Sequence, residues 1–531
     1  MEQKILLGDE AVALGAIHAG LSGGYSYPGT PASEIMEYLI RASDGGKNFV
    51  ASWSVNEKVA FEEALGASYA GKRALVSMKH VGLNVAADPF MNAAITGANG
   101  GLVVVVADDP GMHSSQNEQD SRFYVQFGQI FCFEPSNHQE AYDMTREAFE
   151  ISENMGLPVM VRMVTRLAHS RSRVQPKPVK EQNPIRYGEG KDWTLLPVNA
   201  RRRFKLLTEK QKELIQVSDA SAFNSLRINK NNTRFGIVAS GVAYNYVLEN
   251  LGEDHEAPSL LKVTTYPLPE GLFSELVDHM ETVLVVEEGY PFIERNLHGM
   301  FGLCETNIHG KLSGHLPITG ELTPGVVRLG MGMEPREQRD ISDFPMAGRP
   351  PQLCQGCGHR DTYEALNKAL ESYSQSNVFS DIGCYTLGAL PPYNAIQSCV
   401  CMGASVSMAK GGAEAGVYPS VAVIGDSTFA HSGITPLLDA ATVNTDMTVV
   451  ILDNAIVAMT GGQPTYATGG KLVRIIEGVG VDTNHIRTIV PLPKNLETNI
   501  QVIKEEIEYR GLSVIIAARE CVQQARKKRG S

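Results

Sequence analysis

An aspartate and an asparagine follow two apolar segments in the last third of the chain, and their spacing is suited to metal-bound diphosphate chemistry. The tripeptide Gly425-Asp426-Ser427 directly follows residues 420–424. Asn454 follows residues 447–452, 27 positions after the tripeptide. The carboxyl ends of neighbouring parallel strands are where an open α/β sheet binds ligands. Asp426, the amide oxygen of Asn454 and the carbonyl oxygen of Ile456 are hard ligands that suit Mg²⁺. Taken singly, both motifs are also common turns after strands.

The joint spacing matches the signature of thiamine-diphosphate enzymes, in which a Gly-Asp pair and a later Asn are similarly separated. A glycine pair, Gly461-Gly462, follows the second motif and suits a loop whose backbone lies against a ligand. We therefore predict a site for Mg²⁺ and thiamine diphosphate. Its predicted residues are Gly425, Asp426, Ser427, Asn454, Ile456, Gly461 and Gly462.

Four cysteines form a second set of residues that could do chemistry. Cys354 and Cys357 precede an expected helix, Cys384 comes 27 residues later, and Cys521 lies far beyond them. Thiolates with such spacing can hold an iron–sulfur cubane. The Cys-x-x-Cys pair can also belong to a zinc site, or the thiols can be plain buried side chains. Two further cysteines, at 399 and 401, flank one residue of an apolar run and are expected to be structural.

The segments between these residues predict an α/β fold with short buried strands. Residues 74–78 and 102–107 predict parallel strands separated by a small-residue helix over 84–97. A second α/β unit begins at residues 235–241, and a third contains the apolar segments before Asp426 and Asn454. With roughly 100 to 200 residues per domain, 531 residues suggest about three domains. The stretches 170–233 and 330–351 have weak periodicity and predict linkers, the first with a helix.

Composition excludes several classes of function. The net charge of −12 is spread without long runs of one sign, which argues against a nucleic-acid surface. No run of about 18 uncharged apolar residues is present, so membrane insertion is not expected. The first ten residues lack the features of a secretory signal, and eight cysteines are too sparse for a disulfide scaffold. These features predict a cytoplasmic location.

Four segments resemble the α subunit of the indolepyruvate ferredoxin oxidoreductase family. They are residues 27–34 (YPGTPASE), 53–58 (WSVNEK), 79–89 (KHVGLNVAADP) and 384–392 (CYTLGALPP). The resemblance covers nearly the whole chain in the same order. It implies a pyrimidine-binding domain over 1–175, a linker with a helix over 176–233, a smaller transketolase-C-like α/β domain over 234–335, and a diphosphate- and Mg²⁺-binding domain with the cysteines over 336–531. It also implies a dimer of this subunit, because the cofactor lies between domains of two protomers in such enzymes.

The resemblance assigns catalytic roles to two residues. Glu57 is implied to be the carboxylate that hydrogen-bonds the aminopyrimidine ring of the coenzyme and thereby activates it. An acidic residue at the start of a helix is also favourable through the macrodipole, as Glu62 and Glu63 would be. Thr30 matches the position where relatives place a hydroxyl against the 2-oxo acid. It could also be a helix N-cap, with Pro31 as the first helical residue.

The resemblance further implies a proximal [4Fe–4S] cluster held by Cys354, Cys357, Cys384 and Cys521. It implies coenzyme A as co-substrate and a separate smaller β subunit, which carries the coenzyme-A-side domain. The expected reaction is oxidative decarboxylation of an aryl, indolepyruvate-like 2-oxo acid to an acyl-CoA. Two alternatives remain: a lyase that releases an aldehyde, and a non-catalytic assembly subunit.

Two departures from the family pattern bear on these expectations. The family's α subunit usually continues into a ferredoxin-like segment with two cysteine runs, and this sequence has none, so electrons are expected to pass through a partner to ferredoxin or another carrier. In addition, Gly462 stands where the indolepyruvate type has a histidine after Thr-Gly, which bears on the aromatic substrate.

Overall fold

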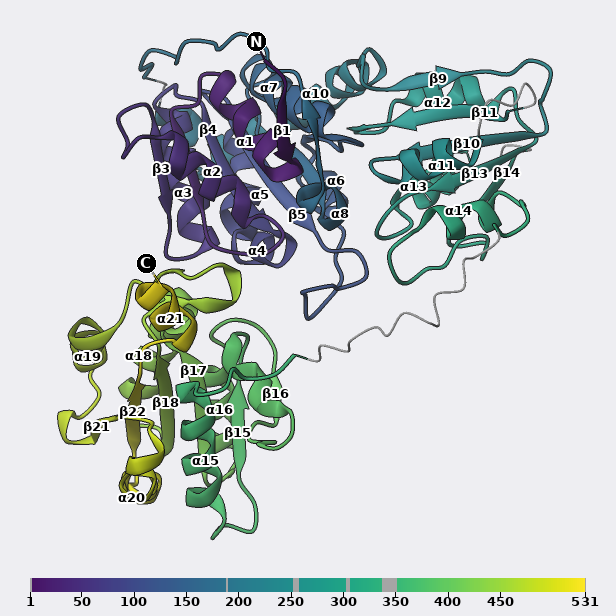
Figure 1. The fold of residues 1–531 in the computed structure, drawn as a ribbon. Helices are drawn as coiled ribbons and strands as arrows, with labels where there is room; N and C mark the ends of the chain where they lie inside the picture. Colours follow the sequence, from purple (N-terminus) through teal and green to yellow (C-terminus); the bar gives the residue numbers. More distant parts are fainter. Residues whose placement is uncertain (1, 188–189, 252–256, 302–305, 337–350, 531) are drawn as a thin grey trace. The chain divides into compact units, whose positions relative to one another are not determined.

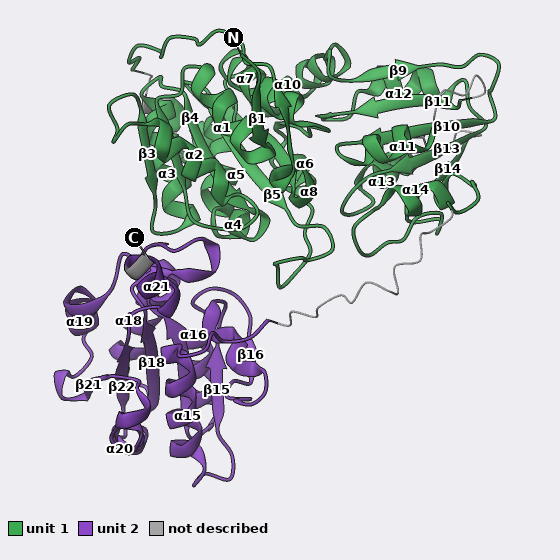
Figure 2. Ribbon diagram, in the orientation of Figure 1, with its two compact units in different colours: residues 1–339 green, residues 340–531 purple. Residues whose placement is uncertain are grey.

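The computed structural model describes residues 2–187, 190–251, 257–301, 306–336 and 351–530 of the chain (Figure 1). It divides into two compact units, residues 1–339 and 340–531, which Figure 2 colours separately. Each unit has its own sheets and hydrophobic clusters and is described by itself below.

The first sheet of unit 1 has seven strands in the order β12-β6-β7-β5-β4-β2-β3. All neighbours are parallel except β12, which pairs antiparallel with β6. The central strands are continuous runs of apolar residues because both of their faces are covered. The strands are β2 (Gly23–Ser26), β3 (Val50–Trp53), β4 (Ala74–Lys79), β5 (Leu102–Asp108), β6 (Phe131–Phe133), β7 (Val159–Val164) and β12 (Thr265–Tyr266).

Helices cover both faces of this sheet because successive strand residues point to opposite sides. Val103 and Val105 belong to the cluster that contains α1, α2 and α7, whereas Val104 and Val106 belong to the cluster that contains α3 and α5. The helices are α1 (Gly8–His18), α2 (Ser33–Ala42), α3 (Glu57–Tyr69), α4 (His80–Val85), α5 (Ala87–Thr96), α6 (Arg122–Gly128), α7 (His138–Met155) and α8 (Thr165–His169).

The single helix predicted over 84–97 is wrong, because α4 and α5 are separate helices that meet at Ala86. Pro89 explains the interruption. A proline has no backbone N–H, and its ring clashes with the carbonyl of the residue four positions earlier, here Val85, if a helix continues through it. Pro89 is instead accommodated in the first turn of α5.

The second sheet of unit 1 has five strands in the order β14-β13-β10-β11-β9, with only β9 antiparallel. Its strands are β9 (Ser225–Arg227), β10 (Phe235–Ser240), β11 (Ser259–Val263), β13 (Thr282–Val286) and β14 (Asn307–His309). The associated helices are α11 (Ala243–Leu251), α12 (Glu270–Val277), α13 (Phe292–Phe301) and α14 (Pro324–Gly330). The stretch before this sheet contains α9 (Gly190–Trp193) and α10 (Pro197–Asp219), and β1 (Lys4–Leu7) pairs antiparallel with β8 (Arg171–Val174).

Two fully buried arginines join the two sheets of unit 1. Arg162 on β7 donates from Nε to Asp108 Oδ2 at 2.7 Å and from Nη1 to Glu134 Oε1 at 2.5 Å, and its Nη2 reaches the Glu288 carbonyl after β13 at 3.4 Å. Arg122 at the start of α6 donates from Nη1 to Glu287 Oε2 at 2.8 Å, directly after β13. Buried charges need such paired, hydrogen-bonded partners. The network therefore fixes the two sheets against each other.

Unit 2 contains one fully parallel six-stranded sheet in the order β16-β15-β17-β18-β22-β21. Its strands are β15 (Asn377–Ser380), β16 (Ser398–Cys399), β17 (Ser420–Gly425), β18 (Met447–Asp453), β21 (Ile486–Ile489) and β22 (Leu512–Ala518). Its helices include α15 (Gly358–Leu370), α16 (Ala404–Glu414), α17 (Asp426–Thr428), α18 (Ile434–Thr442), α19 (Gly469–Gly478), α20 (Leu496–Glu508) and α21 (Val522–Gly530). One face is covered by α15 and α20, and the other by α16, α18 and α19.

The predicted α/β class is confirmed by these three mainly parallel sheets. The division into three domains and a linker stays a prediction, and residues 337–350 of the predicted linker over 330–351 lie outside the described residues. Within the described part of the chain, no helix is long and apolar enough to cross a membrane.

Candidate functional site

The predicted diphosphate loops lie side by side in unit 2. β17 and β18 are parallel neighbours with Gly425 opposite Leu452, so the residues that follow both strands come to the same edge of the sheet. Asp426 Oδ2 accepts a hydrogen bond from the Ala455 backbone N–H at 2.8 Å, which ties the two loops together. Ala455 has a φ of +66°, a conformation that few non-glycine residues adopt. Such backbone strain is typical of functional loops.

The first loop lies at the start of a helical segment, where the helix dipole favours an anion. Asp426 begins a continuous helical segment formed by α17, the π-helix Phe429–Gly433 and α18, so the positive end of the helix dipole lies at this loop, where the Ser427 N–H donates to Asp426 Oδ1 at 2.8 Å. The Ser427 hydroxyl oxygen is buried and has no hydrogen-bond partner within the described residues. Buried hydroxyls are normally paired. An orphan hydroxyl beside a helix start fits a diphosphate oxygen.

Electrostatics around Asp426 fit a cation. Burial raises the pKa of the Asp426 carboxyl well above its usual range, and the neighbouring Asp453 carboxylate raises it further. Asp453 itself is anchored by the Thr468 hydroxyl at 2.6 Å and the Gly469 N–H at 2.8 Å. Two acidic groups next to each other in a buried position repel when both are charged. A divalent cation at Asp426 would offset this repulsion.

The second loop presents the remaining predicted residues. The Asn454 side-chain oxygen accepts from the Ile456 N–H at 3.0 Å, a local turn that fixes the asparagine. Ile456 lies in the short strand β19 (Ile456–Val457), which pairs with β20 (Gln463–Pro464) across the glycine pair. Gly461 and Gly462 have φ angles of +130° and +90°, which favour glycine. The structure therefore explains why glycines occupy these positions.

A buried tyrosine explains the glycine that precedes Asp426. A Cβ on Gly425 would lie 2.6 Å from Cε1 of Tyr385, so only glycine fits against this ring. The Tyr385 hydroxyl donates to Asp381 Oδ1, and Asp381 Oδ2 accepts from the Ser405 hydroxyl at 2.6 Å. Burial raises the pKa of Asp381 to about 6. This network fixes the Tyr385 ring against Gly425, the residue before Asp426. It was not predicted from the sequence.

The four predicted cluster cysteines come together in unit 2. Burial is the main cause that raises the pKa of the Cys384 thiol to about 12, and the nearby thiols of Cys357, Cys521 and Cys354 raise it too. Gln523 Nε2, just after Cys521, lies 3.3 Å from Cys354 Sγ. The Cys521 N–H donates to the Asn454 carbonyl at 3.3 Å. The cysteines therefore lie beside the second diphosphate loop.

The zinc site and the iron–sulfur cluster both stay predictions for these cysteines. A zinc ion needs about four ligands around one point. In the described ranges, no group of three or more His, Cys, Asp or Glu side chains is placed to hold a single metal ion. A cubane does not require this, because each thiolate binds a different iron. A cavity of about 510 Å³ reaches Cys354, and its lining includes Arg360, Gln523 and Arg526.

In unit 1, Glu57 lies at the carboxyl edge of the seven-stranded sheet. It is the first residue of α3, whose N-cap Asn56 accepts from the Val59 N–H at 2.9 Å, and it is 6% exposed. Its carboxylate packs on Gly82 of α4, where a Cβ would lie 2.6 Å from Glu57 Oε1. Helix α4 directly follows β4, and its Gly82 packs against the Glu57 side chain. A carboxylate buried at this edge is well placed to hydrogen-bond a ring.

Thr30 lies in the loop after β2 at the same edge. The helix N-cap suggested for Thr30 is wrong, because α2 begins at Ser33 with Ala32 as its N-cap. The Ala32 N–H donates to the Gly29 carbonyl at 2.8 Å and closes a turn over residues 29–32. Thr30 is only partly buried, so its hydroxyl can still face a ligand.

Lys79 was missed by the sequence reasoning, although it ends the apolar run over 74–78. It is the last residue of β4 and only 7% exposed. Its Cβ lies 3.2 Å from the position a Cβ on Gly29 would take, directly beneath the Thr30 loop. A charged residue at the end of an apolar strand segment was the signal that could have identified it.

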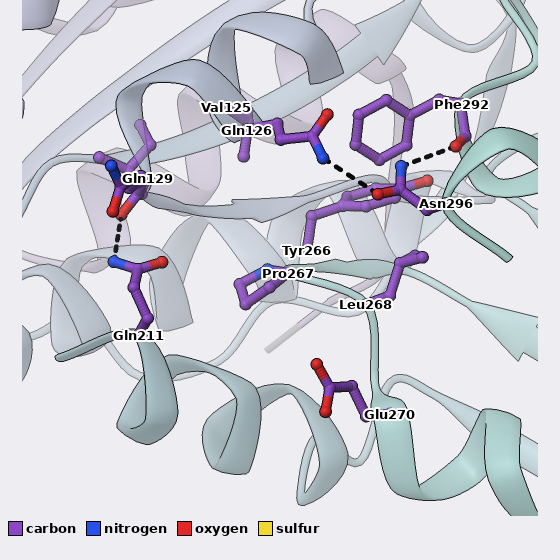
Figure 3. A pocket seen from close by; sticks show the side chains of 11 residues that line it. Val125, Gln126, Gln129, Gln211, Tyr266, Pro267, Leu268, Glu270, Phe292 and Asn296 are labelled. Carbon is purple, nitrogen blue, oxygen red and sulfur yellow. Dashed lines mark hydrogen bonds between the residues drawn. The ribbon is translucent and has the colours of Figure 1, made fainter. Parts of the chain in front are cut away.

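Unit 1 also contains a small pocket of about 140 Å³ (Figure 3). It lies between α6, α10 and α13; the amide side chains of Gln126 and Asn296 point toward each other, and that of Gln211 points toward Gln129. Gln126 Nε2 donates to Asn296 Oδ1 at 3.0 Å, and Gln211 Nε2 donates to the Gln129 carbonyl at 3.0 Å. These amides bind each other or the backbone. The pocket contains none of the predicted site residues.

Two family models match the chain over the regions that carry these loops. Residues 14–195 match the model described as Pyruvate flavodoxin/ferredoxin oxidoreductase, thiamine diP-bdg. Residues 381–516 match the model described as Thiamine pyrophosphate enzyme, C-terminal TPP binding domain. The first match includes Thr30, Glu57 and Lys79, and the second includes Asp426 and Asn454.

Curated relatives match over the full length of the chain. The indolepyruvate oxidoreductase subunit IorA of Archaeoglobus fulgidus is 39% identical over 562 residues, which cover 100% of this chain and 88% of the relative. The subunit IorA of Methanothermobacter thermautotrophicus is also 39% identical with the same coverage. That of Pyrococcus abyssi is 37% identical over 98% of this chain and 86% of the relative.

A solved structure shares the fold. The 2-oxoglutarate:ferredoxin oxidoreductase from Magnetococcus marinus, with 2-oxoglutarate, coenzyme A and succinyl-CoA bound, matches with a TM-score of 0.50 and 18% identity. The match covers 61% of this chain and 64% of that chain. At this identity the likeness shows a common fold.

Proposed function

Because this chain belongs to the family of indolepyruvate oxidoreductase IorA subunits, we propose that it is the thiamine-diphosphate-binding subunit of an enzyme that oxidatively decarboxylates an aryl, indolepyruvate-like 2-oxo acid. The observation that carries the proposal is the hydrogen bond that joins the Asp426 loop to the Asn454 loop beside the orphan Ser427 hydroxyl. A metal-bound diphosphate needs oxygen ligands for the cation, here proposed on the Asp426 and Asn454 loops. It also needs a nearby donor for its own oxygens, here the Ser427 hydroxyl.

The proposed metal ligands are Asp426, Asn454 and the carbonyl of Ile456, which together would bind Mg²⁺. Ser427 would donate to a diphosphate oxygen, while Gly425, Gly461 and Gly462 let the backbone approach. When bound, thiamine diphosphate supplies the electron sink that stabilises the negative charge left as CO₂ departs. The dipole of the helical segment that starts at Asp426 favours the diphosphate charge.

Glu57 is proposed to hold a proton on the aminopyrimidine ring of the coenzyme. Its burial and its contact with Gly82 keep the carboxylate in one orientation, which general acid–base catalysis requires. Thr30 is proposed to donate its hydroxyl proton in a hydrogen bond to the carboxylate or carbonyl oxygen of the 2-oxo acid. Its loop is fixed by the turn at Gly29.

Cys354, Cys357, Cys384 and Cys521 are proposed to hold a [4Fe–4S] cluster, which would accept electrons from the coenzyme. Their position beside the Asn454 loop supports this role, because it keeps the electron path short. Coenzyme A is proposed as acyl acceptor, and a smaller β subunit, a second copy of this chain, and ferredoxin or another carrier as partners. A cluster held by thiolates needs reduced cysteines, which favours the cytoplasm.

The complex purified without oxygen tests this proposal. Wild type, incubated with indolepyruvate or phenylpyruvate, coenzyme A and an artificial electron acceptor, is expected to form an acyl thioester and to reduce the acceptor. Glu57→Gln is expected to lose about 10²- to 10⁴-fold in turnover, the range that a general acid–base group contributes. An aldehyde without acceptor reduction would favour a lyase, and unchanged turnover in Glu57→Gln would favour a non-catalytic subunit.

A further inference from the structure

Lys79 is a buried cation at the carboxyl edge of the seven-stranded sheet. It ends β4, it is 7% exposed, and its stem packs beneath Gly29, the residue before Thr30. Gly82, which supports Glu57, lies only three residues further along the chain. Lys79 therefore contacts the residue before Thr30 and lies close in sequence to the glycine that contacts Glu57.

The hydrogen bonds of Lys79 are incomplete. Its Nζ donates to the Ser114 carbonyl at 2.7 Å, and it forms no second hydrogen bond with any of the described residues. An ammonium has three donors, and a buried donor without an acceptor costs free energy. Two N–H groups of Lys79 thus remain available for a ligand.

The Asp109 carboxylate does not form an ion pair with this ammonium. Asp109 favours the charged lysine electrostatically, but no ion pair joins Lys79 to a carboxylate among the described residues. Both oxygens of Asp109 are used elsewhere: Oδ1 accepts from the Thr165 hydroxyl at 2.7 Å, and Oδ2 accepts from the Ser115 hydroxyl at 2.6 Å. Burial lowers the pKa of Lys79 to about 8, so the ammonium is still mainly protonated at neutral pH.

We propose that the Lys79 ammonium binds the carboxylate of the 2-oxo acid and makes the site selective for anionic substrates. This inference rests on the proposed function. A carboxylate would satisfy the two free donors, and a charge-assisted hydrogen bond in a buried site is about twice as strong as a neutral one. The Thr30 hydroxyl, which is neutral, would orient the same substrate.

The chemistry of decarboxylation determines which kinetic constant Lys79 controls. The substrate carboxylate leaves as neutral CO₂, so its attraction to the ammonium weakens as the carbon–carbon bond breaks. Lys79 therefore stabilises the bound substrate more than the transition state. Removal of such an interaction raises KM and leaves kcat unchanged or higher.

A purely structural role makes a different prediction. Through the Ser114 carbonyl, Lys79 also holds the loop after β5. If this tether were its only role, Lys79→Met would weaken charged and neutral ligands alike. The discriminating quantity is the ratio of the inhibition constants of phenylacetamide and phenylacetate, which have the same ring but differ in charge.

The experiment uses the complete complex with phenylpyruvate as substrate. Lys79→Met is expected to raise KM by about 10- to 100-fold, with kcat within a few-fold of wild type, because the charge-assisted hydrogen bonding of the ammonium to the carboxylate is lost. The preference of wild type for phenylacetate over phenylacetamide is expected to disappear in Lys79→Met and to persist in Lys79→Arg. Lys47→Met, a change at an exposed lysine of the same unit, is the control and should change neither quantity.

The inference is overturned if wild type shows no preference for phenylacetate, or if Lys79→Met keeps it. Should Lys79→Met fail to fold, Lys79→Gln replaces it, because its uncharged amide can still donate to the Ser114 carbonyl, and it is expected to lose the preference for phenylacetate. Binding of the two inhibitors can be followed by calorimetry without turnover. If wild type with bound coenzyme releases no CO₂ from any 2-oxo acid, the proposed function fails, whereas loss of the acid preference alone overturns only the role of Lys79.

Discussion

A methyl group added at Gly82 should displace the proposed catalytic carboxylate without altering its chemistry. A Cβ at this position would lie 2.6 Å from Oε1, 2.7 Å from Cγ and 2.9 Å from Cδ of Glu57. Ordinary contacts of a Cβ begin at 3.4 Å, so Gly82→Ala forces the carboxylate to move by about 0.8 Å, the difference between 3.4 and 2.6 Å. A misplacement of about 1 Å typically costs about 10²-fold in rate.

Gly82→Ala should therefore lower kcat by about 10²-fold while the protein stays folded. The site is helical, where alanine is about 1 kcal/mol more favourable than glycine, and this gain offsets part of the cost of moving Glu57. The assay is acceptor reduction with a 2-oxo acid and coenzyme A, with thermal unfolding measured on the same samples.

Gly66→Ala is the matched control. Gly66 lies in α3, the same helix as Glu57, and an added Cβ there meets no atom within 4 Å. It should keep wild-type kcat. If Gly82→Ala also turned over at the wild-type rate, the observed position of Glu57 would not determine catalysis, and the reasoning would be refuted.

Three further changes test other parts of the molecule. Burial raises the pKa of Glu288 to about 7, whereas the unfolded chain releases this proton near 4.5. The stability that this group contributes is therefore lost as pH rises from 4.5 to 7. Over that window the free energy of unfolding of Glu288→Gln, measured with urea, should rise by up to about 3 kcal/mol relative to wild type. A difference between the two proteins that does not depend on pH would contradict this. Arg162→Met should lower the free energy of unfolding by about 3–5 kcal/mol, because it leaves Asp108 and Glu134 buried without their partner. A loss below about 1 kcal/mol would refute the proposed role of this buried network. Cys384→Ser should lower the iron bound per chain, whereas Cys401→Ser, at an exposed cysteine, should not; equal iron in both would argue against a cluster at Cys384.

The strands were predictable because of their burial. Residues 74–78, 102–107, 420–424 and 447–452 are apolar on both faces, and all four segments lie in central parallel strands. The carboxyl-edge position of Asp426 and Asn454 followed directly from these strands. Their roles as metal ligands stay a prediction.

Features that depend on distant contacts could not be predicted. Strand β12, formed by Thr265–Tyr266, joins the first sheet from a segment far along the chain. The contact of Gly82 with Glu57 and the packing of Lys79 beneath Gly29 also join separate loops. No local sequence pattern predicts such contacts between separate loops, because they depend on how the ends of neighbouring strands align in the folded sheet. The role of Glu57 came from the family resemblance.

The central claim is that unit 2 binds thiamine diphosphate through a cation held at Asp426. The most direct test is equilibrium binding of thiamine diphosphate to the complex with Mg²⁺ and with a chelator, for wild type, Asp426→Asn and Asp439→Asn, the last an exposed control in α18. We expect wild type and Asp439→Asn to bind only with Mg²⁺, and Asp426→Asn to bind at least about 10²-fold more weakly. Binding of wild-type strength by Asp426→Asn, or binding that the chelator does not affect, would contradict the account.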